Sequence, residues 1–193
     1  MPTPERENSG DTGKSVDRDE GQRTVVHLAD GATVRVRPAR GDDGEQLRSM
    51  FLRLSTETRY LYFCAGVPAN ETWAERFAAL GHADGESAFA LVAEAEDASD
   101  GHGELIGLAR FVRAEAGNAA NLSILLADSW QSRGLGREVL DRLRAEALRR
   151  AISIFTGTML WENRRMLRLA KRVFPQVNLA CSQGVCDITI ALG

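Results

Sequence analysis

The segment Ser129–Gly136, with the sequence SWQSRGLG, combines residue types that can bind an anion. Gly134 and Gly136 flank one residue, and an amphipathic stretch follows them directly. A glycine-rich turn that enters a helix presents unpaired N–H groups at the positive end of the helix dipole, and glycine lets a ligand approach the backbone. Ser132 and Arg133 can add a hydroxyl and a positive charge. The segment is therefore either a phosphate-binding loop or only a strand-to-helix turn.

Two common nucleotide-binding motifs do not match this segment. A dinucleotide-binding loop requires a third glycine three residues after Gly136, where the chain has Val139. It also requires an acidic residue at the end of the next strand, where the chain has Leu160. A P-loop requires Gly-Lys followed by Ser or Thr, which this segment lacks. Both of these nucleotide sites are therefore excluded here.

The strands that position this segment can be predicted from the apolar pattern of the chain. Alternating apolar residues between turn residues are typical of strands, and the turn Asp30-Gly31 is typical of a hairpin. We expect a first hairpin within 25–38 and a closing hairpin within 177–192, with its turn at Gln183-Gly184. Between them we expect single strands at 87–96, 103–114, 120–128 and 152–160.

Helices are predicted where apolar residues recur every three or four positions. We expect helices that begin at Asp42, Ser55, Asn70, Gly134 and Asn163. Asp42 and Glu45 have the spacing of a capping box, and Pro175 is expected to end the last helix. The order of elements indicates one α+β (mixed α/β) domain with helices on both faces of a sheet.

The first 23 residues differ from the rest in composition. They carry four Lys/Arg and six Asp/Glu, which gives −2 of the net charge of −3 and leaves −1 for residues 24–193. We interpret 1–23 as a disordered tail and 24–193 as the domain. The near balance of charge argues against a nucleic-acid partner. Because the sequence has neither a long apolar run nor an export signal, we expect no membrane partner and a cytoplasmic location.

The cysteines and histidines indicate neither a disulfide framework nor a metal site. Cys181 and Cys186 could face each other across the closing hairpin. In a reducing cytoplasm we interpret them as two reduced, buried apolar residues. The three histidines do not have the spacing of zinc ligands, so no metal is expected.

Taken together, these segments resemble the GNAT superfamily of acetyl-CoA-dependent acyltransferases. The spacing Gln131-x-x-Gly134-x-Gly136 is similar to its pyrophosphate-loop motif, and Asn163 stands at the strand-to-helix junction of its later motif. The stretch 34–63, VRVRPARGDDGEQLRSMFLRLSTETRYLYF, is similar to the opening of the Pat-type protein-lysine acetyltransferases. The resemblance covers about residues 25–192 and implies a central, mostly antiparallel sheet that is splayed at the cofactor site.

The resemblance also implies roles for individual residues. Backbone groups near Ile124 and Leu126 would pair with the pantetheine arm of acetyl-CoA, which Asn163 would also contact. The residues expected to hold the diphosphate are Gln131, Ser132, Arg133, Gly134, Leu135 and Gly136. The acceptor would be an amine, either a protein lysine or a small molecule, that attacks the thioester directly. The protein would be a monomer or a homodimer.

The family's usual general base is missing from its expected place. Many Pat-type members have a glutamate ten residues before the loop glutamine, where this chain has Asn121, which accepts no proton at neutral pH. Glu115 is one alternative base, with Glu162 and Asp187 as further candidates. Alternatively, the acceptor amine arrives neutral. A third possibility is that the domain binds acyl-CoA with little transfer and has a regulatory or partner role.

Two further groups of residues have a structural and a functional interpretation. The last helix carries a basic cluster, which we interpret as a solvated face rather than a site for the coenzyme's 3′-phosphate. The cluster is Arg164, Arg165, Arg168, Lys171 and Arg172. Trp130 is expected to anchor the loop to the core rather than to stack on adenine.

Overall fold

The computed structural model describes residues 24–96, 103–115 and 117–193. The tail predicted at 1–23 lies outside the described residues. The described chain forms one eight-stranded sheet in the order β1-β2-β3-β4-β5-β6-β8-β7. The strands are β1 Thr24–His27, β2 Thr33–Pro38, β3 Ala88–Ala95, β4 Glu104–Arg113, β5 Ala119–Leu126, β6 Ile154–Leu160, β7 Gln176–Ser182 and β8 Val185–Ala191.

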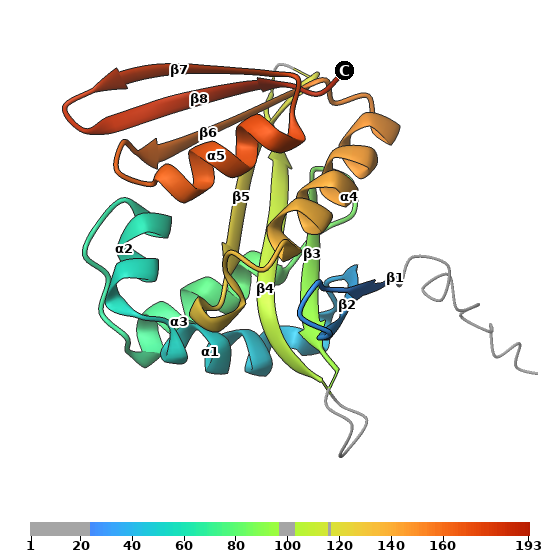
Figure 1. Ribbon diagram of the computed structural model, residues 1–193, viewed down its shortest axis with the longest axis vertical. Helices are drawn as coiled ribbons and strands as arrows, with labels where there is room; N and C mark the ends of the chain where they lie inside the picture. The colour runs from blue at the N-terminus through green and yellow to red at the C-terminus, as the bar shows by residue number, and fades with distance from the viewer. Residues whose placement is uncertain (1–23, 97–102, 116) are drawn as a thin grey trace, which may run out of the picture.

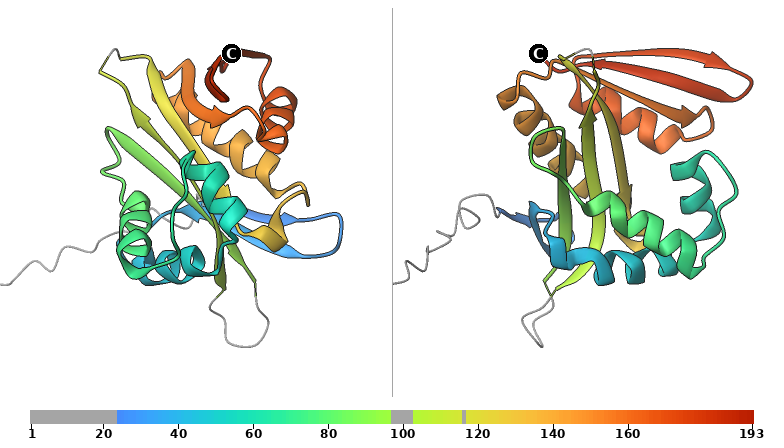
Figure 2. Two further views of the ribbon diagram at one scale, coloured as in Figure 1. Left: turned by 90° about the vertical axis from the view of Figure 1, so that its left-hand side faces the viewer. Right: turned by 180° about the vertical axis from the view of Figure 1, so that it is seen from behind.

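Five α-helices cover the two faces of this sheet, as Figures 1 and 2 show. They are α1 Gly44–Arg53, α2 Thr56–Phe63, α3 Glu71–Ala78, α4 Leu135–Arg149 and α5 Arg164–Val173. Buried residues of α4 and α5 form one core cluster with the sheet, and those of α1 and α3 form a second cluster on the opposite face. The predicted α+β domain is confirmed. No helix in the described part of the chain is long and apolar enough to cross a membrane.

The sheet divides between β5 and β6, its one parallel pair of strands (Figure 1). Strand β4 pairs with β5 along 120–126, whereas β6 pairs with β5 only along 119–121. Beyond Asn121 and its partner Thr156 the two strands separate, and β6 continues with β8 and β7. The edge of β5 at 122–126 is therefore left without a strand partner on the side of β6, which is the predicted splay.

Three of the predicted helix starts are confirmed by a side chain that caps the helix, and the predicted start at Asp42 is wrong. Ser55, Asn70 and Asn163 each accept a hydrogen bond from the backbone N–H three residues later. The first helix does not begin at Asp42: a 3-10 turn Gly41–Asp43 precedes α1. It is the Asp43 carboxylate that accepts the Arg40 N–H, at 2.7 Å. The capping-box spacing therefore predicted the wrong aspartate. Asp43 takes this place because an arginine from β2 binds its carboxylate.

That arginine, Arg37, is the centre of a buried ionic cluster. It donates two hydrogen bonds to Asp43, at 2.7 and 2.9 Å, and a third at 3.0 Å to Glu94. The exposed fractions of Arg37, Asp43 and Glu94 are only 5%, 3% and 8%. The cluster joins β2, the turn before α1, and β3. Because a buried charge is tolerated only when it is paired and hydrogen-bonded, these three side chains depend on one another.

The closing hairpin corrects our interpretation of the cysteines. Cys181 on β7 lies opposite Cys186 on β8, and the two form a disulfide. Their positions in the hairpin were expected, but the reduced, buried state was wrong. Cys186 is buried in the core under α5, whereas Cys181 is exposed. Opposite residues in an antiparallel pair have neighbouring Cβ atoms, which puts the two sulfurs within bonding reach.

Candidate functional site

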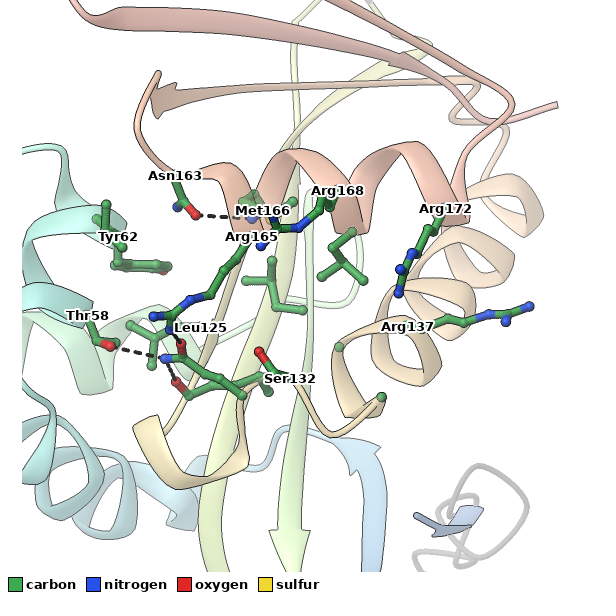
Figure 3. Close-up of a pocket in the computed structure, with 17 residues that line it drawn as sticks. Thr58, Tyr62, Leu125, Ser132, Arg137, Asn163, Arg165, Met166, Arg168 and Arg172 are labelled. Atoms are coloured by element: carbon green, nitrogen blue, oxygen red, sulfur yellow. Dashed lines mark hydrogen bonds between the residues drawn. The ribbon is translucent and has the colours of Figure 1, made fainter. Parts of the chain in front are cut away.

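A cavity of about 480 Å³ opens where β5 and β6 separate. Its walls come from α2, the end of β5, the loop before α4, and α5 (Figure 3). A second cavity of about 90 Å³ lies deeper between the separating strands. The two adjoin, because both are lined by Leu61, Tyr62, Ile124, Asn163 and Met166. None of the described residues that line either cavity is Asp, Glu or His.

The glycine loop forms the floor of the larger cavity at the start of α4. Gly134 has a φ of 93°, a left-handed conformation that a side chain rarely adopts. Gly136 is buried, and a Cβ atom there would lie 2.9 Å from Cδ2 of Leu169 on α5. The loop therefore brings the N-terminus of a 15-residue helix to the cavity, with glycine at two of the positions that line it.

Gln131 is fixed by contacts to three different elements (Figure 3). Its Nε2 donates to Oγ1 of Thr58 on α2 and to the carbonyl of Leu126 on β5, both at 3.0 Å. Its Oε1 accepts from Arg165 on α5 at 2.7 Å. Gln131 thus links the two walls of the cavity to the end of β5. This side chain sets the shape of the cavity.

Asp128, just before the loop, holds the start of α2. Its carboxylate accepts hydrogen bonds from the N–H and hydroxyl of Ser55, at 2.9 and 2.5 Å, and from the hydroxyl of Thr58 at 2.7 Å. Burial raises the pKa of Asp128, but the hydrogen bonds from Ser55 and Thr58 outweigh it, so the pKa lies below its usual value. Folding therefore favours the ionised carboxylate.

We expect Asp128→Asn to reduce the free energy of unfolding by roughly 0.5–1 kcal/mol at pH 7, because the carboxylate is exposed to screening. The pKa of Asp128 is depressed in the folded state. Its contribution is therefore present above the unfolded pKa, near 3.9, and is lost as the pH falls through the folded value. Urea unfolding at pH 7 and pH 3 measures the difference. If the difference in the free energy of unfolding between wild type and variant is larger at pH 3 than at pH 7, the assignment is contradicted.

Tyr62 on α2 and Ser123 on β5 meet at the smaller cavity. The Tyr62 hydroxyl donates to Oγ of Ser123 at 3.2 Å. Burial raises the pKa of Tyr62, so the phenol stays protonated and remains a donor. No local sequence signal marks this pair, because its members are 61 residues apart.

The predicted basic face of α5 is more than a solvated surface. Arg165, Arg168 and Arg172 line the larger cavity, and Arg137 of α4 lines it from the other side (Figure 3). Arg168 and Arg172 have no ion-pair partner among the described residues. The cavity therefore has a positively charged wall above the glycine loop.

Most of the predicted cofactor residues surround the larger cavity. Those that line it are Ile124, Leu126, Gln131, Ser132, Gly134, Gly136 and Asn163. Two others point elsewhere: Leu135 is fully buried in the core, and Arg133 pairs with Asp30 in the β1–β2 turn. Arg133 also lies 4.2 Å from the ring centre of Trp130, which packs on the core beside the loop as expected.

The expected base positions lie outside both cavities. Asn121 is exposed on β5, and Glu115 is exposed in the turn between β4 and β5. Glu162 lies beside Tyr60, where its negative charge is the main reason that the pKa of Tyr60 is raised. Asp187 accepts a hydrogen bond from Thr158 at 3.1 Å. Among the described residues, no carboxylate lines the cavities where the strands separate, although Thr158, the partner of Asp187, lines the smaller one.

Comparisons with known proteins agree with this geometry. Residues 33–173 match the family model of the acetyltransferase (GNAT) domain. An acetyltransferase of Pseudomonas aeruginosa is 28% identical over 140 residues, which cover 70% of this chain and 73% of that protein. The crystal structure of the GNAT domain of S. lividans PAT has a TM-score of 0.73 and 27% identity, and covers 88% of this chain and 96% of that one. A cAMP-binding acyltransferase from Mycobacterium smegmatis has the same fold, with a TM-score of 0.59 and 21% identity over 89% of this chain and 48% of that chain.

Proposed function

Because the chain belongs to the GNAT acetyltransferase family, we propose that it is an acetyl-CoA-dependent N-acetyltransferase that acts on an amine. The observation that supports this most directly is the unpaired edge of β5, which ends at the glycine loop. A pantetheine arm carries amides that can pair with such an edge. The diphosphate would then reach the N-terminus of α4.

The proposed roles follow from the positions around the cavities. The backbone of Ile124 and Leu126 would pair with pantetheine, and an N–H there would stabilise charge that develops on the thioester oxygen. The loop residues 131–136 would hold the diphosphate through the backbone, with Arg168 and Arg172 as counter-charges. Asn163 uses its Oδ1 to cap α5, which leaves its amide N–H₂ to face the ligand.

The transfer itself needs a neutral amine. The amine nitrogen forms a bond to the thioester carbon and loses a proton to water, the carbon–sulfur bond breaks, and coenzyme A leaves as a thiolate that takes a proton from water. A lysine with a pKa of about 10.4 is neutral only about once in 2,500 molecules at pH 7. A positioned base typically contributes roughly 10²- to 10⁴-fold. Because none of the described residues that line the cavities is a carboxylate, the transfer would proceed without such a base or would use a carboxylate outside the lining. Asp187 is one such group, since it is hydrogen-bonded to Thr158 of the smaller cavity, and Glu115 and Glu162 are the others.

The missing carboxylate favours a second candidate function, an acyl-CoA-binding domain with weak transfer and a regulatory or partner role. Binding calorimetry with acetyl-CoA and thiol release with amines and lysine peptides separate the two. The enzyme should bind acetyl-CoA and release coenzyme A with at least one amine. Binding without release from any acceptor supports the second function, and a failure to bind any acyl-CoA excludes both.

The smaller cavity predicts a preference for short acyl groups. Its volume of about 90 Å³ is about one fifth of the 480 Å³ of the larger cavity, so it has room for a small group only. We therefore expect butyryl-CoA to be used at least about tenfold less well than acetyl-CoA, since overpacking costs about 1–3 kcal/mol.

Met159→Ala is the matching test, because Met159 lines the smaller cavity and is buried. The variant should lower the ratio of the turnover rate with acetyl-CoA to the turnover rate with butyryl-CoA. Met50→Ala is the control, since Met50 belongs to α1 and is buried in the other core cluster. Both lose core packing, but only Met159→Ala should change the ratio. If the two ratios are equal, the smaller cavity does not hold the acyl group.

A further inference from the structure

Strands β4 and β5 present a second group of polar side chains on the face opposite α4. Alternate residues of a strand point to opposite faces. Ala109, Phe111 and Ala120 belong to the core cluster under α4. Arg110 and Ser123, which alternate with them, therefore lie on the other face, where they are directly opposite each other. This is also the face from which Tyr62 reaches Ser123.

Arg110 differs from the other partly or fully buried arginines near it. Arg37 is paired with two carboxylates, Arg59 donates to the carbonyls of Leu54 and Val67, and Arg113 donates to those of Gly117 and Arg150. For Arg110 no hydrogen bond or ion pair exists within the described residues. Its side chain is nevertheless partly buried. A partly desolvated guanidinium without a partner is a site for an anion, and a carboxylate fits its fork best.

Arg110 is not among the residues that line either cavity, but it lies directly opposite Ser123, which lines the smaller one. Burial raises the pKa of Tyr62, and the hydrogen bond with Ser123 and then the positive charge of Arg110 oppose that rise. The guanidinium is therefore electrostatically coupled to the Tyr62–Ser123 pair, which lines the smaller cavity. An acceptor whose carboxylate met Arg110 would have its other end beside that cavity.

The choice of an acceptor with an α-amino group also reduces the need for a general base. An α-amino group has a reference pKa near 8 and is neutral in about one molecule in ten at pH 7, roughly 250 times more often than a lysine side chain. In a free amino acid the neighbouring carboxylate keeps the proton on the amine, and an ion pair with Arg110 would oppose that effect. This gain is comparable to the roughly 10²- to 10⁴-fold contribution of a positioned base.

We propose that the acceptor is a small α-amino acid, whose carboxylate pairs with Arg110 and whose amine lies beside Tyr62 and Ser123 at the smaller cavity. The inference rests on the proposed acetyltransferase function and narrows its acceptor. In the reaction the neutral α-amine forms the amide bond, the thioester C–S bond breaks, and the amine's proton passes to water. The products are an N-acetyl amino acid and coenzyme A.

The test compares acceptors that differ only in the carboxylate. Thiol release from acetyl-CoA is measured with methionine and leucine, with methioninamide and leucinamide, and with spermidine and a lysine peptide. The wild type should prefer the acids over the amides at least about tenfold in kcat/KM, although the amides hold the larger fraction of neutral amine. Equal or better use of the amides, spermidine or the peptide overturns the proposal.

Variants of Arg110 test the residue itself. Arg110→Gln should raise KM for the acids roughly 10- to 100-fold, as expected for a lost charge-assisted pair, and leave KM for acetyl-CoA and the amides unchanged. Arg110→Lys should keep part of the preference. Arg149→Gln is the control, because Arg149 is an exposed residue of α4, and this variant should keep the full preference for the acids over the amides. An acid preference that survives in Arg110→Gln overturns the assignment.

A binding measurement separates this inference from the proposed function. With coenzyme A present, methionine should raise the melting temperature of the wild type but not of Arg110→Gln. A methionine-dependent shift without any turnover would refute the acetyltransferase function and leave the carboxylate site standing. Turnover of amines without a preference for acids would refute only the carboxylate site.

Discussion

Gly134→Val is expected to weaken acetyl-CoA binding by about 100-fold while the chain stays folded. Gly134 has a φ of 93° and caps α4. A β-branched residue opposes that conformation, and the loop must turn away from it. The N–H groups at the start of α4 then no longer converge on the diphosphate. The loss of one or two charge-assisted hydrogen bonds, at about 1.5–3 kcal/mol each, corresponds to about 100-fold.

Gly184→Val is the matched control for this change. Gly184 has a φ of 83° in the β7–β8 turn and, like Gly134, has no atom within 4 Å of an added Cβ. The two variants therefore introduce the same kind of backbone strain, but only one lies at the cavity. Calorimetry should show a changed Kd for acetyl-CoA in Gly134→Val alone. A similar Kd in both variants would mean that the loop does not bind the diphosphate.

Arg37→Met is expected to have the largest effect on stability, a loss of roughly 3–5 kcal/mol. Asp43 and Glu94 would remain buried, without the guanidinium that now donates three hydrogen bonds to them. The free energy of unfolding in urea, followed by circular dichroism, measures this loss. It is a large share of the roughly 5–15 kcal/mol that stabilises a typical domain.

Arg35→Met is the control on the same strand. Arg35 forms an ion pair with Glu96 at 2.9 Å, and both side chains are about one third exposed, at 34% and 36%. Its contact with the buried cluster is limited to a longer distance of 3.9 Å to Glu94. Such a surface pair is worth about 0–1 kcal/mol. A comparable loss in the two variants would show that burial does not govern the contribution of Arg37.

The sequence carries the local information that forms the helices and the loop. Ser55, Asn70 and Asn163 cap helices because a short polar side chain reaches an N–H three residues away, and this signal is readable in a few residues. The same holds for Gly134, which needs no distant partner to adopt its conformation. These parts of the fold, and most of the residues that line the larger cavity, were predictable.

Contacts between distant segments could not be predicted in this way. Asp43 rather than Asp42 holds the start of α1, because Arg37 reaches it from β2. Tyr62 meets Ser123 only after α2 has packed beside the separated strands. Arg133 looked suited to a phosphate by its position in the loop, but Asp30 lies close enough to pair with it. In each case the partner is set by tertiary packing, which a single-sequence pattern does not contain.

The separation of β5 from β6 gives this sheet two edges in its interior, in addition to the outer edges at β1 and β7. An open edge usually invites a strand of another chain. Here residues of α2 and α5 line the cavity beside the open edge, so a strand of another chain would have to displace them. A narrow ligand that carries amides could pair with the edge inside the cavity. The same feature would admit an amide-bearing ligand and protect the protein from edge-to-edge aggregation.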